Sequence, residues 1–99
     1  MTNQKTLTVA NEILRQLGGR RFQIMTGSNS FRGDDSSLTM NLKRNKARAK
    51  YLTIKLTSMD DYTLTWYNNK AEVIAIDEGI FCNMLQDVFT ERTGIYTIL

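Results

Sequence analysis

Alternating apolar and polar residues occupy the middle of the chain and predict a series of half-buried β-strands. In residues 38–42, 51–57 and 62–67, an apolar side chain recurs at every second position. A period of two places the two kinds of side chain on opposite faces of a strand. A further apolar run, Ala71–Ile76, follows an Asn-Asn-Lys sequence that favours a tight turn, and it predicts another strand of the same sheet.

Strand signals are also present on either side of this central block. Arg20–Thr26 places Phe22 and Ile24 on one side, and we expect it to form the first strand. Residues 95–99 are mostly β-branched or aromatic, and we expect them to return to the sheet as a terminal strand. Residues 27–37 are rich in glycine, serine, asparagine and aspartate, which predicts a surface loop.

Two segments have the 3.6-residue periodicity of an amphipathic helix. Residues 7–17 carry one apolar stripe, and the two glycines that follow favour the end of a helix. This stripe consists of Ala10, Ile13, Leu14 and Leu17. Residues 80–90 carry the second stripe, whose members are Phe81, Met84, Leu85, Val88 and Phe89. Both segments are therefore predicted to be helices that bury one face.

These elements predict an α+β fold. One helix is N-terminal and the other lies near the C-terminus, and between them runs a meander of about five to six antiparallel strands. Both amphipathic helices should then cover the same face of the sheet. The other face carries mostly threonine, lysine and tyrosine and is polar enough to face water. A length of 99 residues fits one domain, and we expect residues 1–99 to form it.

The composition is typical of a globular protein of the cytoplasm. Hydrophobic residues make up 41% of the chain and charged residues 23%, which is ordinary for a globular domain. No apolar run approaches the roughly 20 residues that cross a bilayer. The first residues also lack the apolar region of a signal peptide. We therefore expect a cytoplasmic protein that has no contact with a membrane.

Few residues of this chain can support catalysis or metal binding. It contains no histidine and a single cysteine, so nucleophile–histidine pairs and histidine-containing zinc sites are excluded within it. That cysteine, Cys82, follows an apolar residue of the second stripe, and we expect it to be a small core residue. The paired carboxylates at 34–35 and 60–61 lie in turn-like sequences. The sequence therefore predicts a protein that is not an enzyme and needs no metal or other cofactor.

Positive charge is concentrated in the first part of the chain. Residues 1–58 carry eleven Lys or Arg against three Asp or Glu, whereas residues 59–99 carry two against seven. A basic tract at residues 43–50 contains five of the cations, and they are Lys43, Arg44, Lys46, Arg48 and Lys50. Such a cluster favours contact with a polyanion. The alternative is that the basic and acidic halves of the chain neutralise each other in the fold.

We predict that further residues extend the basic tract into a binding surface. Tyr51 comes directly after the tract and, with Tyr67 on the open face, is placed to stack an unpaired base. Lys55 lies on the outward side of the same strand. Three other cations are expected to enlarge the positive surface, and they are Arg20, Arg21 and Arg32. The alternatives are a solvated hairpin tip whose charges keep the sheet edge soluble, and an acidic protein surface as the partner.

Two stretches together resemble small uncharacterised proteins encoded by bacteriophages and integrated mobile elements. One stretch is 16–22 with Met25-Thr26-Gly27, and the other is 79–82 with 89–96. The shared residues are structural and form a helix stop, a strand, a capped helix and a closing strand. The resemblance implies a setting in the bacterial cytosol during propagation of a phage or element. Small phage proteins often bind nucleic acid or block a host defence component.

These observations lead to two functional hypotheses. The first is a non-enzymatic binding module whose basic hairpin and polar sheet face bind nucleic acid or a nucleoprotein complex. The second is an inhibitor or adaptor that docks on a host factor, such as a defence protein, by adding a strand at a sheet edge. The predicted terminal strand is also a candidate edge for pairing with a second copy of the chain.

Overall fold

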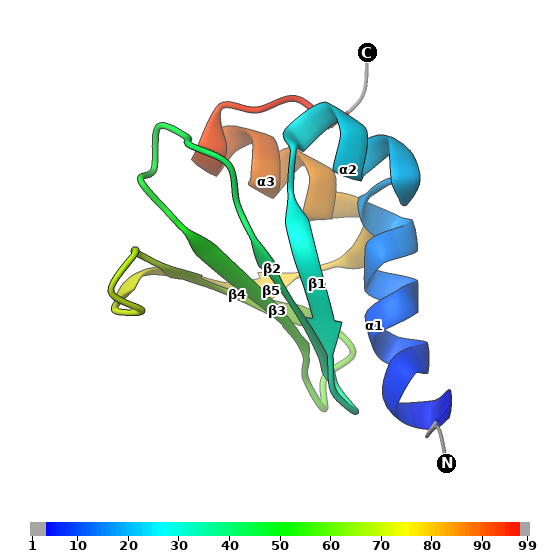
Figure 1. The fold of residues 1–99 in the computed structure, drawn as a ribbon. Helices are drawn as coiled ribbons and strands as arrows, with labels where there is room; N and C mark the ends of the chain where they lie inside the picture. The colour runs from blue at the N-terminus through cyan, green and yellow to red at the C-terminus, as the bar shows by residue number, and fades with distance from the viewer. Residues whose placement is uncertain (1–3, 98–99) are drawn as a thin grey trace.

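The computed structural model describes residues 4–97 and shows a five-stranded sheet with helices packed on it (Figure 1). Every strand is antiparallel to its neighbour, and the order across the sheet is β1-β2-β3-β4-β5. The strands are β1 (Asn29–Gly33), β2 (Ser37–Asn41), β3 (Tyr51–Leu56), β4 (Tyr62–Tyr67) and β5 (Val73–Ile80). The helices are α1 (Gln4–Leu17), α2 (Arg20–Thr26), the short 3-10 helix η1 (Cys82–Met84) and α3 (Leu85–Thr93). The predicted α+β class and the antiparallel meander are confirmed.

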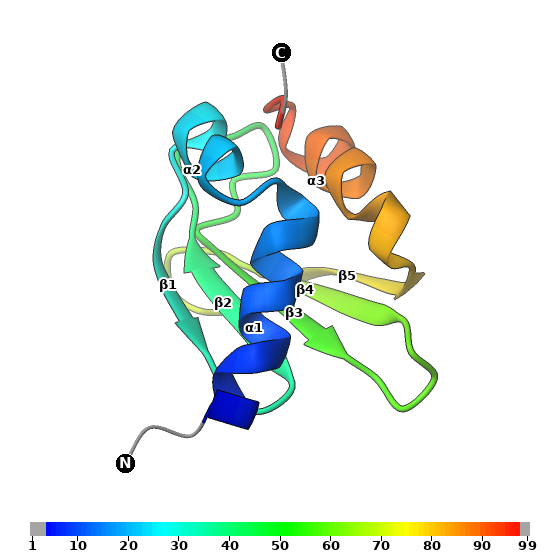
Figure 2. The ribbon, with the colours of Figure 1, turned by 90° about the vertical axis from the view of Figure 1, so that its right-hand side faces the viewer.

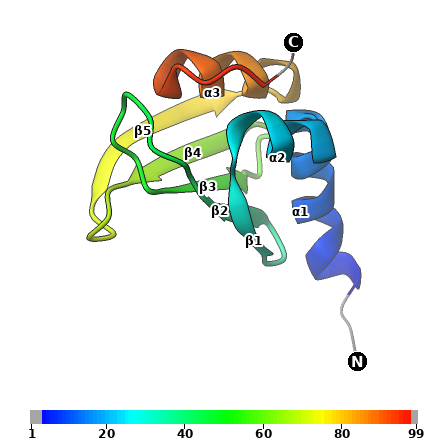
Figure 3. The same ribbon diagram turned by 45° about the horizontal axis from the view of Figure 1, so that its top comes forward.

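The helices cover one face of the sheet and leave the other face open (Figure 2 and Figure 3). Helix α1 contacts β1 and β2, and α3 contacts α1. Leu52, Leu64 and Trp66 point from the central strands into the core and are fully buried. Ile13 and Leu17 of the first predicted stripe are also fully buried. The prediction that the N-terminal helix and the helix near the C-terminus share one sheet face is therefore confirmed.

Three aromatic rings from three different elements form the centre of the core. Phe22 of α2 meets Phe89 of α3 edge to face, with 4.9 Å between the ring centroids. The ring centroids of Trp66 in β4 and Phe89 are 6.1 Å apart. Complete burial of a phenylalanine side chain contributes about 1.5–3 kcal/mol to the free energy of unfolding. This aromatic cluster therefore attaches α2 and α3 to the sheet.

The segment Arg20–Thr26 is helix α2, so the prediction of a first strand there is wrong. Its buried residues, Phe22 and Thr26, lie four positions apart on one face of the helix, whereas Ile24 is 73% exposed. The Thr26 hydroxyl donates to the carbonyl of Phe22 at 2.7 Å. Gly27 ends the helix in the left-handed conformation. Apolar residues at alternate positions gave a misleading strand pattern, because Phe22 enters the core and Ile24 does not.

Strand β1 lies in the segment that its composition predicts to be a loop. Ser30 has a positive φ of 55°, and the register with β2 shifts between Asn29 and Arg32. This bulge brings Phe31 against the core while Arg32 contacts side chains of the open face. A bulge breaks the simple alternation of side chains. A polar strand with a bulge therefore has the sequence pattern of a loop.

The second predicted helix begins later than its apolar pattern suggests. Strand β5 continues to Ile80, and helical structure starts only at Cys82. Leu85 and Phe89 are buried as predicted, but Phe81 is 55% exposed. Cys82 is exposed as well, so the expectation that it is a core residue is wrong. It lies in η1, which precedes α3 and the buried side chains of that helix.

The predicted terminal strand is absent from residues 95–97, and residues 98–99 lie outside the described part of the chain. Gly94 ends α3 with a positive φ of 76°. The Thr93 hydroxyl then accepts a hydrogen bond from the N–H of Ile95 at 3.1 Å. Ile95 packs against the core. The β-branched residues Ile95 and Thr97 therefore reflect burial and not strand pairing.

Helix α1 approaches the sheet closely at Gly33 of β1. A Cβ atom added to Gly33 would lie 2.3 Å from the Cβ atom of Ala10. We expect Gly33→Ala to lower the free energy of unfolding by about 1–3 kcal/mol, because the helix and strand must move apart. Ala10→Gly costs about 1 kcal/mol of helix propensity by itself. In the double variant it should nevertheless recover part of the Gly33→Ala loss. Urea unfolding of the two single variants and the double variant measures this coupling, and strictly additive losses would contradict the close approach.

Candidate functional site

The basic tract connects β2 to β3 as an ordered loop, here called the basic loop and defined as residues 43–50. At its base, the N–H of Lys50 donates to the carbonyl of Tyr67 in β4 at 2.7 Å. At its tip, the N–H of Lys46 donates to the carbonyl of Thr93 at the end of α3 at 3.2 Å (Figure 1). The basic loop is therefore attached both to the sheet and to a helix.

Asn45 holds the backbone of the basic loop in place. Its Nδ2 donates to the carbonyls of Lys43 and Ala49 at 2.7 and 2.8 Å. Its Oδ1 accepts hydrogen bonds from the N–H groups of Ala47 and Ala49 at 3.1 and 3.3 Å. Asparagine commonly forms such local bonds to the backbone. The sequence shows an asparagine inside a run of cations. The pattern of charge alone does not indicate that this side chain bonds to the loop backbone.

The five cationic side chains of the basic loop are exposed, and none forms an ion pair with another described residue. Ion pairs in the described part of the chain lie within α1 and between β5 and α3. The acidic half of the chain therefore does not neutralise the basic loop by direct pairing. Together with Asn68 and Asn69, the loop lines an open hollow of about 900 Å³, here called the basic hollow. Uncompensated positive charge around a concave surface attracts anions.

A smaller hollow lies on the open face of the sheet. Tyr51 of β3 and Tyr67 of β4 are register partners there. This tyrosine hollow has a volume of about 360 Å³ and is lined by Arg32, Thr39, Tyr51, Tyr67 and Ala71. Tyr51 follows Lys50 in the chain, and Tyr67 precedes Asn68, so residues that line the two hollows are covalent neighbours. The basic hollow and the tyrosine hollow are thus linked along the chain at the ends of β3 and β4, whereas Lys46 of the basic loop reaches toward α3 on the helix-covered side of the sheet.

Hydrogen bonds orient Arg32 beside the tyrosine hollow. Its Nη1 donates to Oδ1 of Asn41 at 3.0 Å and also to the carbonyl of Ser30. Asn41 is the register partner of Tyr51, so the guanidinium group lies next to the tyrosine pair. Arg32 comes from β1, and its place could not be predicted while that segment was read as a loop.

Lys55, Arg20 and Arg21 lie apart from the two hollows. Lys55 is near the other end of β3, where its register partner is Ser37. Arg20 and Arg21 form the first turn of α2, whereas the opposite end of that helix, at Gly27, approaches the basic loop. The other predicted residues form two groups: Tyr51 and Arg32 line the tyrosine hollow, and the basic hollow is lined by Lys43, Arg44, Lys46, Arg48 and Lys50.

The paired carboxylates Asp34-Asp35 belong to a turn, as the sequence predicted. Oδ1 of Asp34 accepts hydrogen bonds from the N–H groups of Ser36 and Ser37 at 3.0 and 2.9 Å. The backbone bond from Ser36 and the hydroxyl of Ser37 hold the pKa of Asp34 below its usual value, and the charge of Lys55 adds a smaller effect. A carboxyl group with a lowered pKa stays ionised at neutral pH, so Asp34 serves the turn as a hydrogen-bond acceptor.

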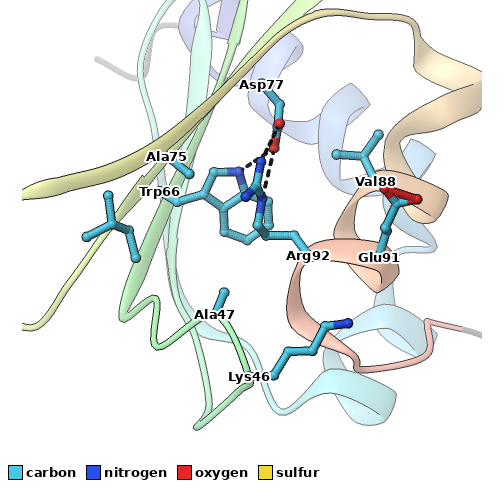
Figure 4. Close-up of a pocket in the computed structure, with 9 residues that line it drawn as sticks. Lys46, Ala47, Trp66, Ala75, Asp77, Val88, Glu91 and Arg92 are labelled. Carbon is cyan, nitrogen blue, oxygen red and sulfur yellow. Dashed lines mark hydrogen bonds and ion pairs between the residues drawn. The ribbon is translucent and has the colours of Figure 1, made fainter.

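Trp66, Asp77 and Arg92 form a hydrogen-bonded group at the edge of the core (Figure 4). Asp77 accepts from the indole Nε1–H of Trp66 at 2.9 Å and from Nη2 of Arg92 at 2.6 Å. The group borders a hollow of about 430 Å³ between β5, α3 and the basic loop. Because the carboxylate and the guanidinium satisfy each other, this group fixes α3 to the sheet and does not present a free acid or base.

Neither a metal site nor a relative identifies the function. No cluster of three or more histidine, cysteine or acidic side chains in residues 4–97 is arranged to hold a metal ion. Across the same residues, every helix is too short or too polar to span a bilayer. Comparison with protein-family models, curated proteins and solved structures yields no significant match. The resemblance to phage and mobile-element proteins therefore stays a prediction.

Removal of the Asn45 side chain tests whether the basic loop is ordered by it. Asn45→Ala should lower the free energy of unfolding by about 1–3 kcal/mol, because the backbone groups of a partly buried loop lose their partners. Amide hydrogen exchange at Ala49 should also accelerate. Asn69→Ala, in the neighbouring exposed turn, is the matched control and should change stability by less than about 0.5 kcal/mol. Equal effects of the two substitutions would show that Asn45 does not hold the loop.

Proposed function

We propose that this protein is a non-enzymatic binding module of a phage or mobile element and acts in the cytoplasm of the bacterial host. Its basic loop binds nucleic acid or a nucleoprotein complex. The observation that carries this proposal is the set of exposed cations around the basic hollow, which stand on an ordered loop and form no ion pair within residues 4–97. A nucleic acid backbone presents the complementary charge in a regular array. The cellular setting is supported by the resemblance of two stretches of the chain to phage and mobile-element proteins.

The chemistry of the loop side chains favours contacts to phosphate. Arg44 and Arg48 present planar guanidinium groups that can bond to two phosphate oxygens at once, whereas the lysines act as point charges. Each neutralised phosphate releases condensed counterions, so the affinity falls as the salt concentration rises. Such contacts position the backbone and do not read the bases. We therefore expect binding with a strong salt dependence and little sequence preference.

Removal of two charges from the basic loop tests this proposal. Arg44→Gln with Lys50→Gln should weaken binding of a fluorescent oligonucleotide at low salt. The slope of log affinity against log salt concentration should fall by about 0.7–0.9 for each phosphate that the variant no longer neutralises. Fluorescence anisotropy at several salt concentrations measures both quantities.

The matched control removes two positive charges from other parts of the surface. Arg15→Gln with Lys55→Gln gives the same net charge, but Arg15 lies on α1 and Lys55 near the far end of β3. This variant should bind with nearly the affinity and slope of the wild type. Equal weakening by both variants would indicate a general charge effect. No binding of any nucleic acid at low salt would end the proposal.

A second candidate function is docking on a host protein through the edge strand β5. This strand is outermost in the sheet, and the side chains of Val73 and Ile76 are each 53% exposed. An edge with apolar side chains offers backbone hydrogen bonds and contact area to an added strand. The register shifts of β5 against β4 shorten its regular part. The exposed edge supports a role as an inhibitor or adaptor of a host factor. The same edge also fits pairing with a second copy of the chain.

Ile76→Lys tests this second candidate. In pull-downs from nuclease-treated bacterial lysate, it should reduce recovery of a partner protein by about tenfold, because a charge on the edge opposes strand addition. Met59→Lys adds the same charge in an exposed turn between β3 and β4 and should leave recovery unchanged. Loss of the partner on nuclease treatment, or unchanged recovery with Ile76→Lys, would contradict docking at β5.

A further inference from the structure

We infer that the tyrosine hollow binds an unpaired nucleobase, stacked on Tyr51 and Tyr67, so that the protein selects single-stranded over double-stranded nucleic acid. This inference rests on the proposed function, because the basic loop must bring the strand to the sheet. It goes beyond that function in naming the form of nucleic acid and the residues that recognise it.

The first observation is the position of the two tyrosines. They are register partners in adjacent strands, so their side chains project from the same face. That face is opposite the helices, since the next residues along the strands, Leu52 and Trp66, are fully buried on the core side. Both rings are only partly buried and line a hollow. Two aromatic rings on an uncovered sheet face give a platform on which a flat base can stack.

The second observation is the polar surroundings of this platform. The hydroxyls of Thr39 and Thr53 bond to each other at 2.9 Å, so the floor beside the rings is polar and satisfied. Arg32 is held by Asn41 and by the carbonyl of Ser30 through one of its nitrogen atoms. A guanidinium group has five N–H donors, and those not used here can bond to a base edge or a phosphate. Arginine also stacks on flat rings.

The third observation is the link between the tyrosine hollow and the basic hollow through the chain and one backbone hydrogen bond. Lys50 and Tyr51 are adjacent in the chain, and the N–H of Lys50 donates to the carbonyl of Tyr67. The backbone at the base of the basic loop and the two tyrosines are therefore fixed relative to each other by the β3–β4 pairing. We infer that a nucleic acid backbone held by the basic loop passes around the ends of β3 and β4 and places an unpaired base on the platform. Only a strand with unpaired bases can present a base face in this way, because the faces in a duplex are occupied by their neighbours.

Four oligomers of equal length separate the contributions of the backbone, the bases and the sugar. They are oligo-dT, an abasic deoxyribose-phosphate strand, a DNA duplex and oligo-rU. Wild-type protein should bind oligo-dT roughly ten- to hundredfold more tightly than the abasic strand, which is the range expected for stacking of one base. The duplex, which offers phosphates but no free base face, should bind more weakly than oligo-dT. The ratio of oligo-rU to oligo-dT binding shows whether RNA or DNA is the preferred single strand, and either preference supports the inference.

Substitution of the tyrosines assigns the effect to the platform. Tyr51→Leu and Tyr67→Leu should each weaken oligo-dT binding by roughly tenfold, with an unchanged salt slope and unchanged abasic binding. Tyr51→Phe should bind like the wild type, because stacking needs the ring and not the hydroxyl. Wild-type binding by Tyr51→Phe also shows that a substitution at this position leaves the protein folded. Tyr96→Leu is the control, since Tyr96 is exposed and lies after α3.

The possible results separate this inference from the function on which it rests. Equal affinity for oligo-dT and the abasic strand, lowered together by Arg44→Gln with Lys50→Gln, would overturn stacking and leave nucleic acid binding by the loop intact. Tighter binding of the duplex than of oligo-dT would also overturn it. Absence of binding to all four oligomers at low salt would overturn both proposals.

Discussion

The pairing of β3 with β4 determines both the core and the exposed surface of this protein. In this register Leu52 lies opposite Trp66, and Tyr51 lies opposite Tyr67. The first pair is fully buried beneath the helices, while the second lies on the open face. Because side chains alternate along a strand, a slip of one residue would exchange the two pairs and expose the tryptophan. Burial of Trp66 against Phe89 therefore also fixes where the tyrosines lie.

The same part of the sheet holds the basic loop at the surface and keeps its cations out of the core. The basic loop begins and ends at neighbouring strands, so its cations remain beyond the end of the sheet, where water solvates them. Less exposed charges are instead paired within the fold, since Asp77 bonds to both Trp66 and Arg92. A core that satisfies its own polar groups leaves the loop cations available for a partner. The charged residues that stabilise the fold are thus distinct from the cations of the basic loop.

The sequence was informative where side-chain periodicity and burial coincide. Strands β2, β3 and β4 were predicted to within a residue or two, because each has one buried face and one wet face. Helix α2 and strand β1 were not predicted. Phe22 and Ile24 alternate without both being buried, and the bulge at Ser30 removes the alternation that identifies a strand. The grouping of the loop cations was visible in the sequence, but the positions of Arg32 and Lys55 depend on tertiary register.

The network around Asn45 also affects the energetics of the binding that we propose for the basic loop. A flexible basic segment loses backbone and side-chain freedom when it binds, and that loss opposes association. Here the backbone freedom is already removed during folding by four hydrogen bonds to Asn45. The chain thus presents a preorganised cationic surface, in which only the ends of the lysine and arginine side chains still have to be ordered on contact.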